Sequence, residues 1–318
     1  MKLSIGKFRG LQRCTSEHGT FTCLALDHRQ NLRKALKPAN PSAVSDAQLS
    51  AFKLEVTKAL ADNSTAVLLD PEVSAAQGVA EGVIPKQVGL VVAVESTGYT
   101  GDPNARRSRI LPGWSIEKTK RMGADAVKLL VYYHPDSPTS GDIETFVEQV
   151  AEDCRKYDLA IMLEPLSYSL EDGKRLSSAE KCRIVVETAR RLSPLGVDVL
   201  KAEFPLDIAD KDESAWVAVC AGISAASVTP WILLSAAVDY ETYVRQVAAA
   251  CNSGASGIAV GRAVWQEAVS MDGEARLAFL RTTGRERLSR LSALCIDLGK
   301  PVTDFFVADV PFDWYKNY

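Results

Sequence analysis

Residues 197–203 read VDVLKAE, an almost continuous apolar run that ends in a lysine and a glutamate. Seven other short runs of the same character follow one another along the chain: 21–27 (FTCLALD), 65–70 (TAVLLD), 90–95 (LVVAVE), 126–132 (AVKLLVY), 160–164 (AIMLE), 231–235 (WILLS) and 257–261 (GIAVG). Strands covered on both faces are apolar nearly throughout, whereas strands with one wet face alternate. The eight runs therefore predict a parallel sheet whose two faces are both buried.

Longer helical patterns separate these runs, at residues 47–63, 115–122, 142–157, 177–193, 213–221 and 240–253. Ser45, Ser178 and Asp239 stand where helix start signals are expected. Such alternation indicates an α/β fold, either a (βα)8 TIM barrel or a large doubly wound sheet. The glycine spacing of a dinucleotide-binding fold and the Walker A pattern are both absent. We therefore expect one (βα)8 domain over residues 1–318, with a short N-terminal segment and a C-terminal helical extension.

Composition and charge exclude several classes of protein. Apolar residues make up 47% of the chain and charged residues 24%, the mixture of an ordinary soluble protein. With 37 Lys and Arg against 40 Asp and Glu, we expect no nucleic-acid partner. No apolar stretch is long enough to cross a membrane, and the N-terminus lacks the apolar core of a signal peptide. The seven scattered cysteines lack paired spacing and predict free thiols in the cytoplasm.

Polar side chains stand at or near the ends of the predicted strands: Asp27, Asp70, Glu95, Lys128, Glu164, Lys201, Glu203, Ser235 and Arg262. In a barrel, the catalytic side chains come from the C-terminal ends of the strands. Because side chains alternate between the two faces of a strand, Val199, Lys201 and Glu203 share one face. The same alternation places Asp27, Lys128 and Glu164 on the inward faces of their strands.

Two lysines inside an apolar lumen need an explanation, because burying an unpaired ammonium is costly. One interpretation is a buried ion pair of Lys201 or Lys128 with Glu164 or Asp27 that only stabilises the fold. The other is Schiff-base chemistry, since a lysine beside another cation in a desolvated site has a lowered pKa and can attack a ketone carbonyl. Glu164 would then shuttle protons. No metal is expected, because the chain has only three histidines.

The last two predicted strands indicate an anion site. Residues 233–236 (LLSA) and 257–263 (GIAVGRA) stand where barrels commonly hold phosphate, through backbone N–H groups and a helix N-terminus. Gly261 would let the backbone approach a ligand closely, and Arg262 would make a bidentate contact. The alternative is a tight turn followed by a surface arginine.

At these residues the chain resembles the class I tagatose-1,6-bisphosphate aldolase family, which also includes sulfofructose-phosphate aldolases. The matching motifs run through nearly the whole barrel: 24–29 (LALDHR), 68–72 (LLDPE), 95–99 (ESTGY), 108–112 (SRILP), 123–128 (GADAVK), 200–203 (LKAE), 234–236 (LSA) and 261–265 (GRAVW). The resemblance implies a (βα)8 barrel that cleaves a ketose 1,6-bisphosphate to dihydroxyacetone phosphate and glyceraldehyde 3-phosphate. It implies Lys201 as the Schiff-base lysine, Glu164 as the acid/base and a homo-oligomer as the assembly.

Two features are open. The family pattern has glutamine after the first aspartate, where this chain has His28, which either contacts a substrate hydroxyl or only caps a loop. The basic loop 104–109 (NARRSR) either holds a second phosphate or a sulfonate, or is solvated. For His134, and for the cluster of Trp114, Tyr132 and Tyr133, loop packing is the favoured interpretation.

The predicted site divides into two sets of residues. The catalytic set is Lys201, Glu164, Lys128 and Asp27. The substrate-binding set is His28, Asp70, Glu95, Arg109, Glu203, Ser235, Gly261 and Arg262. We expect a class I aldolase acting on a phosphorylated ketose, without a metal or other cofactor. The alternatives are a sulfofructose-1-phosphate aldolase or another ketose-phosphate aldolase, another barrel enzyme such as an isomerase or a transaldolase-like enzyme, and a non-catalytic sugar-phosphate sensor.

Overall fold

The computed structural model describes residues 1–207, 210, 212–236, 238–308, 310–316 and 318. Eight parallel strands close into a barrel in chain order, with the last strand paired to the first. The strands are β1 Phe21–Ala25, β2 Ala66–Leu69, β3 Gly89–Ala93, β4 Ala126–Tyr132, β5 Ala160–Leu166, β6 Val199–Ala202, β7 Trp231–Leu234 and β8 Gly257–Val260. The closed order confirms the (βα)8 prediction and excludes the doubly wound sheet.

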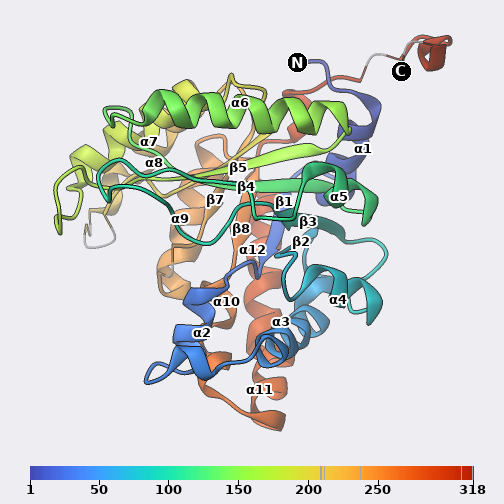
Figure 1. The fold of residues 1–318 in the computed structure, drawn as a ribbon, viewed down its shortest axis with the longest axis vertical. Coiled ribbons are helices and arrows are strands. Elements are labelled where there is room, and N and C mark those ends of the chain that lie inside the picture. The colour runs from blue at the N-terminus through green and yellow to red at the C-terminus, as the bar shows by residue number, and fades with distance from the viewer. Residues whose placement is uncertain (208–209, 211, 237, 309, 317) are drawn as a thin grey trace.

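Helices surround the barrel (Figure 1). They are α1 Ile5–Cys14, α2 Gln30–Leu36, α3 Asp46–Leu60, α4 Ala75–Ala80, α5 Ile116–Arg121, α6 Ser140–Lys156, α7 Ser178–Leu192, α8 Trp216–Ala226, α9 Tyr240–Asn252, α10 Arg262–Trp265, α11 Gly273–Phe279 and α12 Arg285–Leu298. Apolar side chains fill the layer between strands and helices. The predicted C-terminal extension is present as α11 and α12, and α12 packs against α9.

Local capping explains where several helices begin. Ser45 and Asp239 cap α3 and α9, as predicted. The prediction of Ser178 as a start signal is wrong, because the cap of α7 is Ser177. The Ser177 hydroxyl accepts from the Glu180 N–H, and the Glu180 carboxylate accepts from the Ser177 N–H. Such a reciprocal pair requires Glu or Gln three residues after the cap, which fits Ser177 and not Ser178.

The strand register sorts the inward side chains into layers. Lys128 on β4 lies level with Ala93 on β3 and Met162 on β5. Glu164 lies one layer further toward the C-terminal ends of the strands. Below these charged layers the lumen is filled by small and apolar side chains, among them Cys23, Ala66, Val91, Ala126, Ala160, Val199, Ile232 and Ala259. This packing confirms the predicted alternation.

The N-terminal helix α1 packs against one end of the barrel. Leu11 and Cys14 of α1 pack with Phe21 and Phe306 in the lumen cluster. Lys7 of α1 donates to buried Asp198, just before β6, at 2.8 Å. The helix therefore seals the N-terminal end of the barrel, and the opposite end is left for ligand entry. Figure 1 shows the two termini near each other at this end.

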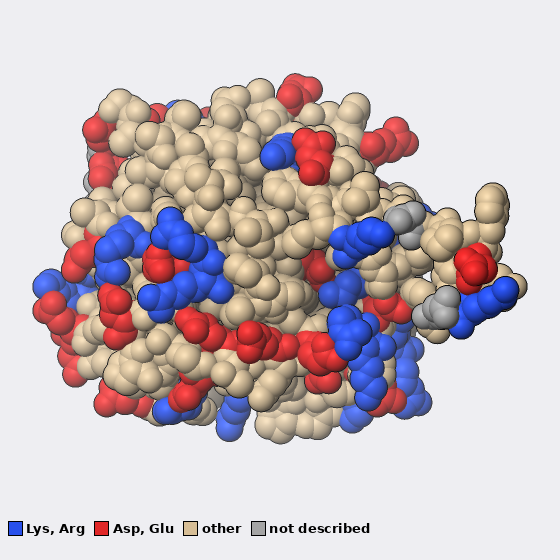
Figure 2. All heavy atoms as spheres, turned by 90° about the horizontal axis from the view of Figure 1, so that it is seen from above, with Lys and Arg blue, Asp and Glu red and all other residues tan. Residues whose placement is uncertain are grey.

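The surface carries both signs of charge. On the face seen in Figure 2, groups of basic side chains alternate with acidic ones. None of the helices in the described part of the chain is long and apolar enough to span a membrane. All seven cysteines are free thiols, and all but Cys182 are buried.

Candidate active site

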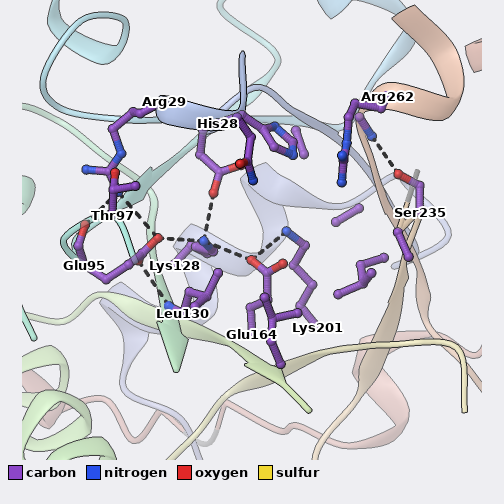
Figure 3. A pocket seen from close by; sticks show the side chains of 18 of the residues that line it. His28, Arg29, Glu95, Thr97, Lys128, Leu130, Glu164, Lys201, Ser235 and Arg262 are labelled. Carbon is purple, nitrogen blue, oxygen red and sulfur yellow. Dashed lines mark hydrogen bonds and ion pairs between the residues drawn. The ribbon is translucent and has the colours of Figure 1, made fainter. Parts of the chain in front are cut away.

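A cavity of about 340 Å³ lies at the C-terminal ends of the strands. Figure 3 shows lysine and carboxylate side chains pointing toward one another in it, with Arg262 and Ser235 on the opposite side. The cavity is lined by all the predicted site residues except Asp70 and Arg109: Asp27, His28, Glu95, Lys128, Glu164, Lys201, Glu203, Ser235, Gly261 and Arg262.

Lys128 is held by three carboxylates. Its ammonium donates to Asp27 at 2.8 Å and to Glu95 at 2.7 Å, and lies 2.9 Å from Glu164. Burial would lower the pKa of Lys128, but the three carboxylates outweigh burial and hold it well above its ordinary value. Lys128 is therefore held in its protonated, positively charged form.

Lys201 lies on β6, next to the strand that carries Glu164, and its ammonium has a different set of contacts from that of Lys128. It is 4% exposed and donates to Glu164 at 2.9 Å. Within the described residues no second carboxylate lies within ion-pair distance of the Lys201 ammonium. A single proton transfer to Glu164 would therefore leave a neutral amine in the cavity, next to the fixed charge of Lys128.

Two carboxylates of the cavity, Glu164 and Asp27, are ionised. Burial alone would raise the pKa of Glu164, but Lys128 and Lys201 outweigh burial and lower it. The same two lysines hold the pKa of Asp27 well below its usual range. Both groups are thus available as proton acceptors at neutral pH. Across the described residues, no three His, Cys, Asp or Glu side chains are grouped so that they could hold a metal ion.

Ser235, Gly261 and Arg262 form the other side of the cavity. The Gly261 N–H donates to the Ser235 hydroxyl at 3.4 Å. A Cβ at Gly261 would lie 2.8 Å from the Ala25 carbonyl oxygen, so only glycine allows this approach of β8 to β1. In the part of the chain that the structure describes, no carboxylate forms an ion pair with the half-buried Arg262. A guanidinium without a carboxylate partner, beside a hydroxyl and a backbone N–H, suits an oxyanion.

His28 lies between these two sides, with its ring edge-on to Trp265. Its Nδ1 atom is buried and lacks a hydrogen-bond partner among the described residues. Burial lowers the pKa of His28 to about 4; Asp27 opposes this effect, and Arg262 reinforces it. The imidazole is therefore neutral at physiological pH, and its buried Nδ1 is left without a partner among the described residues.

The neutral state of His28 predicts a pH-dependent stability. Between pH 6.5, the ordinary pKa of histidine, and about pH 4, the unfolded chain binds a proton that the folded protein does not. Stability therefore falls as the pH is lowered through this window, by up to about 1.4 kcal/mol per pH unit. Urea unfolding of the wild type and of His28→Gln at several pH values measures this slope. Equal slopes in the two proteins would contradict the prediction.

Asp70 was predicted to bind substrate, but the structure places it outside the cavity. Its carboxylate is fully buried and pairs with fully buried Lys53 of α3. The same carboxylate accepts from the Ser74 hydroxyl at 2.7 Å and from the Val73 N–H at 3.0 Å. Because Lys53 approaches from the helix layer, the side chain of Asp70 points away from the lumen. A sequence pattern that ends a strand in aspartate does not distinguish these two directions.

Replacing Asp70 by asparagine should therefore affect folding and not chemistry. An unpaired buried Lys53 should lower the free energy of unfolding by about 3–5 kcal/mol. Urea denaturation measures this loss, and kcat of the folded fraction should change less than threefold. Asp142→Asn is the matched control, because the Arg107–Asp142 pair is exposed and its loss should cost less than about 1 kcal/mol. A large loss of kcat with unchanged stability would contradict this assignment.

Arg109, also predicted to bind substrate, is exposed and does not line the cavity. Its neighbour Arg106 instead lies against Tyr132, which does line it. Tyr133 is buried and donates to Glu144. His134 accepts the Asp136 N–H at 3.1 Å. Loop packing is therefore confirmed for Tyr133 and His134.

Two other residues near the site have positioning contacts. Glu203 accepts from the Ser167 N–H at 2.7 Å and from the Ser167 hydroxyl at 2.6 Å, so this carboxylate holds the loop after β5. Arg29 belongs to the motif at residues 24–29, but the sequence did not predict a role for it. It donates to the Glu95 carbonyl oxygen at 2.8 Å and to Glu72. Its place directly after Asp27 and His28 was the signal that could have identified it.

Fold and site together define a class, the (βα)8-barrel enzymes with a lysine–carboxylate centre at the C-terminal ends of the strands. The family model for DeoC/LacD family aldolases matches residues 21–267. The chain therefore belongs to the DeoC/LacD family of aldolases, enzymes that break and form carbon–carbon bonds.

Curated relatives match over nearly the full length. The tagatose 1,6-diphosphate aldolase of Lactococcus lactis subsp. lactis is 31% identical over 327 residues, covering 96% of this chain and 99% of that protein. The tagatose 1,6-diphosphate aldolase of Listeria monocytogenes serotype 4a is 32% identical, covering 92% and 93%.

Solved structures share the fold. An archaeal fructose 1,6-bisphosphate aldolase has a TM-score of 0.61 at 21% identity, covering 91% of this chain and 98% of that one. The fructose-bisphosphate aldolase of Plasmodium falciparum has a TM-score of 0.71 at 14% identity, covering 94% and 98%.

Proposed function

We propose that this chain is a class I aldolase that cleaves a phosphorylated ketose, such as tagatose or fructose 1,6-bisphosphate. The products are dihydroxyacetone phosphate and an aldehyde. The observation that carries the proposal is the unequal pairing of the two buried lysines. Among the described residues, Lys128 is held by three carboxylates, whereas Lys201 pairs only with Glu164. Lys201 is thus the lysine that one proton transfer converts into a nucleophile.

The chemistry then follows from the contacts. Glu164 takes a proton from Lys201, and the free amine attacks the C2 carbonyl. The C2 oxygen receives one proton from the attacking nitrogen and a second from Glu164 and leaves as water, and a cationic Schiff base remains. A carboxylate, Glu164 or Asp27, then takes the proton of the C4 hydroxyl. The electron pair of the C3–C4 bond passes to the iminium nitrogen, and the aldehyde leaves. Protonation of the enamine at C3 and hydrolysis release dihydroxyacetone phosphate.

Lys128 contributes a fixed charge to this sequence. Its ammonium holds Asp27, Glu95 and Glu164 ionised and close together. Ser235, Gly261 and Arg262 would bind the 1-phosphate of the substrate, which places C2 next to Lys201. His28, neutral and in the lining of the cavity, would contact a substrate hydroxyl. We further propose a single cytoplasmic domain over residues 1–318 that assembles as a homo-oligomer and needs no metal.

Borohydride trapping tests the proposal. Reduction in the presence of dihydroxyacetone phosphate should fix a covalent adduct on Lys201, which peptide mapping by mass spectrometry locates. Cleavage of the ketose bisphosphate should persist after treatment with a chelator. An unmodified Lys201 peptide together with full turnover would overturn the Schiff-base assignment. An adduct on Lys128 would reverse the roles of the two lysines.

A further inference from the structure

Arg29 lies where three loops of the candidate active site meet. It follows β1 directly after Asp27 and His28 and lines the cavity, but only 8% of it is exposed. One terminal nitrogen of its guanidinium donates to the Glu95 carbonyl oxygen at 2.8 Å, and the other donates to Glu72. Glu72 lies in the turn after β2 and Glu95 in the loop after β3, so one side chain connects three βα loops.

A guanidinium suits this junction better than an ammonium. Its donors form a rigid, planar fork, so its two terminal nitrogens reach a carbonyl and a carboxylate at the same time. A lysine would supply a single nitrogen on a flexible stem. Burial would lower the pKa of Arg29, but Glu72 and Glu95 outweigh burial and raise it. The cation is therefore permanent, and its direction is set by its two partners.

Glu95 connects Arg29 to the lysine–carboxylate centre. Arg29 holds the backbone of Glu95 through its carbonyl oxygen, and the Glu95 carboxylate lies 3.9 Å from the same guanidinium. One oxygen of this carboxylate accepts from Lys128 at 2.7 Å, and the other accepts from the Leu130 N–H at 3.1 Å. The position of both oxygens therefore depends on where the loop after β3 is held.

Charges of opposite sign alternate from this junction to the proposed nucleophile. Glu95 lies 3.9 Å from Arg29 and 2.7 Å from Lys128. Glu164 lies 2.9 Å from Lys128 and 2.9 Å from Lys201. Figure 3 shows the five side chains in this order across the cavity. Because each member attracts the next, a displacement of Glu95 changes how the Lys128 ammonium is placed against Glu164.

We propose that Arg29 is a positioning residue that acts on the reaction through Glu95 and Lys128. By holding Glu95 in place, it keeps the Lys128 ammonium against Glu164, and Glu164 is then oriented to take the proton of Lys201. Both terminal nitrogens of Arg29 are already engaged by the protein, so it is not assigned a contact with the reacting atoms. The inference rests on the proposed function, because it takes Lys201 as the nucleophile.

Amide hydrogen exchange tests the hold on Glu95 without any turnover. The Leu130 N–H donates to the Glu95 carboxylate, so its protection reports where that carboxylate lies. Val127 on the same strand serves as the internal reference, and the ratio of the two exchange rates cancels a change in global stability. In Arg29→Met the ratio of the Leu130 rate to the Val127 rate should rise by roughly tenfold or more. An unchanged ratio overturns the inference.

Steady-state kinetics tests the link to catalysis. Arg29→Met should lower kcat for ketose bisphosphate cleavage by about 10- to 100-fold, because Glu164 is no longer held in its productive position. KM should change less than about threefold, since the proposed phosphate contacts at Arg262 are untouched. Arg29→Lys keeps the charge but not the fork, and its kcat should stay within about threefold of that of Arg29→Met. Full kcat per folded molecule in Arg29→Met would mean that Arg29 only stabilises the fold, and would overturn the inference.

Arg33→Met is the matched control. Arg33 lies on α2 and, like Arg29, donates to one backbone carbonyl and one carboxylate, those of Val44 and Asp46, but it does not line the cavity. This variant should keep the exchange ratio and kcat of the wild type, and equal losses in the two arginine variants would overturn the inference. Failure of the proposed function is seen separately, as a wild type that neither cleaves nor is trapped by borohydride. The exchange ratio still decides in that case whether Arg29 holds Glu95.

Discussion

Replacing Lys201 by methionine is expected to lower kcat for ketose bisphosphate cleavage by on the order of 10⁴-fold or more, and to abolish borohydride trapping. Methionine keeps the volume of the side chain but supplies no nitrogen to attack C2. Glu164 keeps its contact with Lys128 at 2.9 Å, so the carboxylate is not left unpaired. Steady-state assays of dihydroxyacetone phosphate release, together with mass mapping, measure both effects.

Lys201→Arg is the control that separates chemistry from folding. Arginine keeps the positive charge beside Glu164 but cannot lose its proton in a protein. If the Lys201–Glu164 pair only stabilised the barrel, this variant would retain activity. We expect it to fold, to bind hexitol 1,6-bisphosphate and to be as inactive as Lys201→Met. Substantial turnover by the arginine variant would contradict the nucleophilic role.

The barrel could be predicted from the sequence because its signals are local. Runs such as 126–132 and 197–203 are apolar throughout, and strand alternation alone places Lys128, Glu164 and Lys201 in the lumen. The difference in ion pairing between Lys128 and Lys201 could not be predicted from the sequence. It depends on Asp27 and Glu95, which are 101 and 33 residues from Lys128 in the chain and meet it only when the barrel closes.

The predictions that Asp70 and Arg109 line the cavity were wrong for the same kind of reason. Asp70 follows a strand, as Asp27 and Glu95 do. Lys53, however, approaches from the helix layer and determines where the Asp70 carboxylate points. In the loop 104–109, charge predicted an anion contact, but Arg109 is exposed and does not line the cavity. Arg106 of the same loop is held by three tyrosines from separate parts of the chain, which the sequence does not bring together.

Replacing Glu164 by glutamine is expected to lower kcat by about 10²- to 10⁴-fold while KM changes little. Glutamine keeps the size and a hydrogen-bonding oxygen, so substrate binding at Ser235 and Arg262 is preserved. It cannot accept the proton of Lys201 or return one to the departing C2 oxygen. Single-turnover measurements should therefore show slow Schiff-base formation, and dihydroxyacetone phosphate should still be trapped on Lys201 after long incubation.

Glu203→Gln provides the matched comparison. Glu203 lines the same cavity, but its carboxylate oxygen already accepts hydrogen bonds from the Ser167 N–H and hydroxyl. Its kcat should fall less than tenfold. Equal losses in the two variants would mean that Glu164 contributes only charge to the lumen. A loss confined to Glu164→Gln assigns proton transfer to Glu164, which contacts both Lys128 and Lys201.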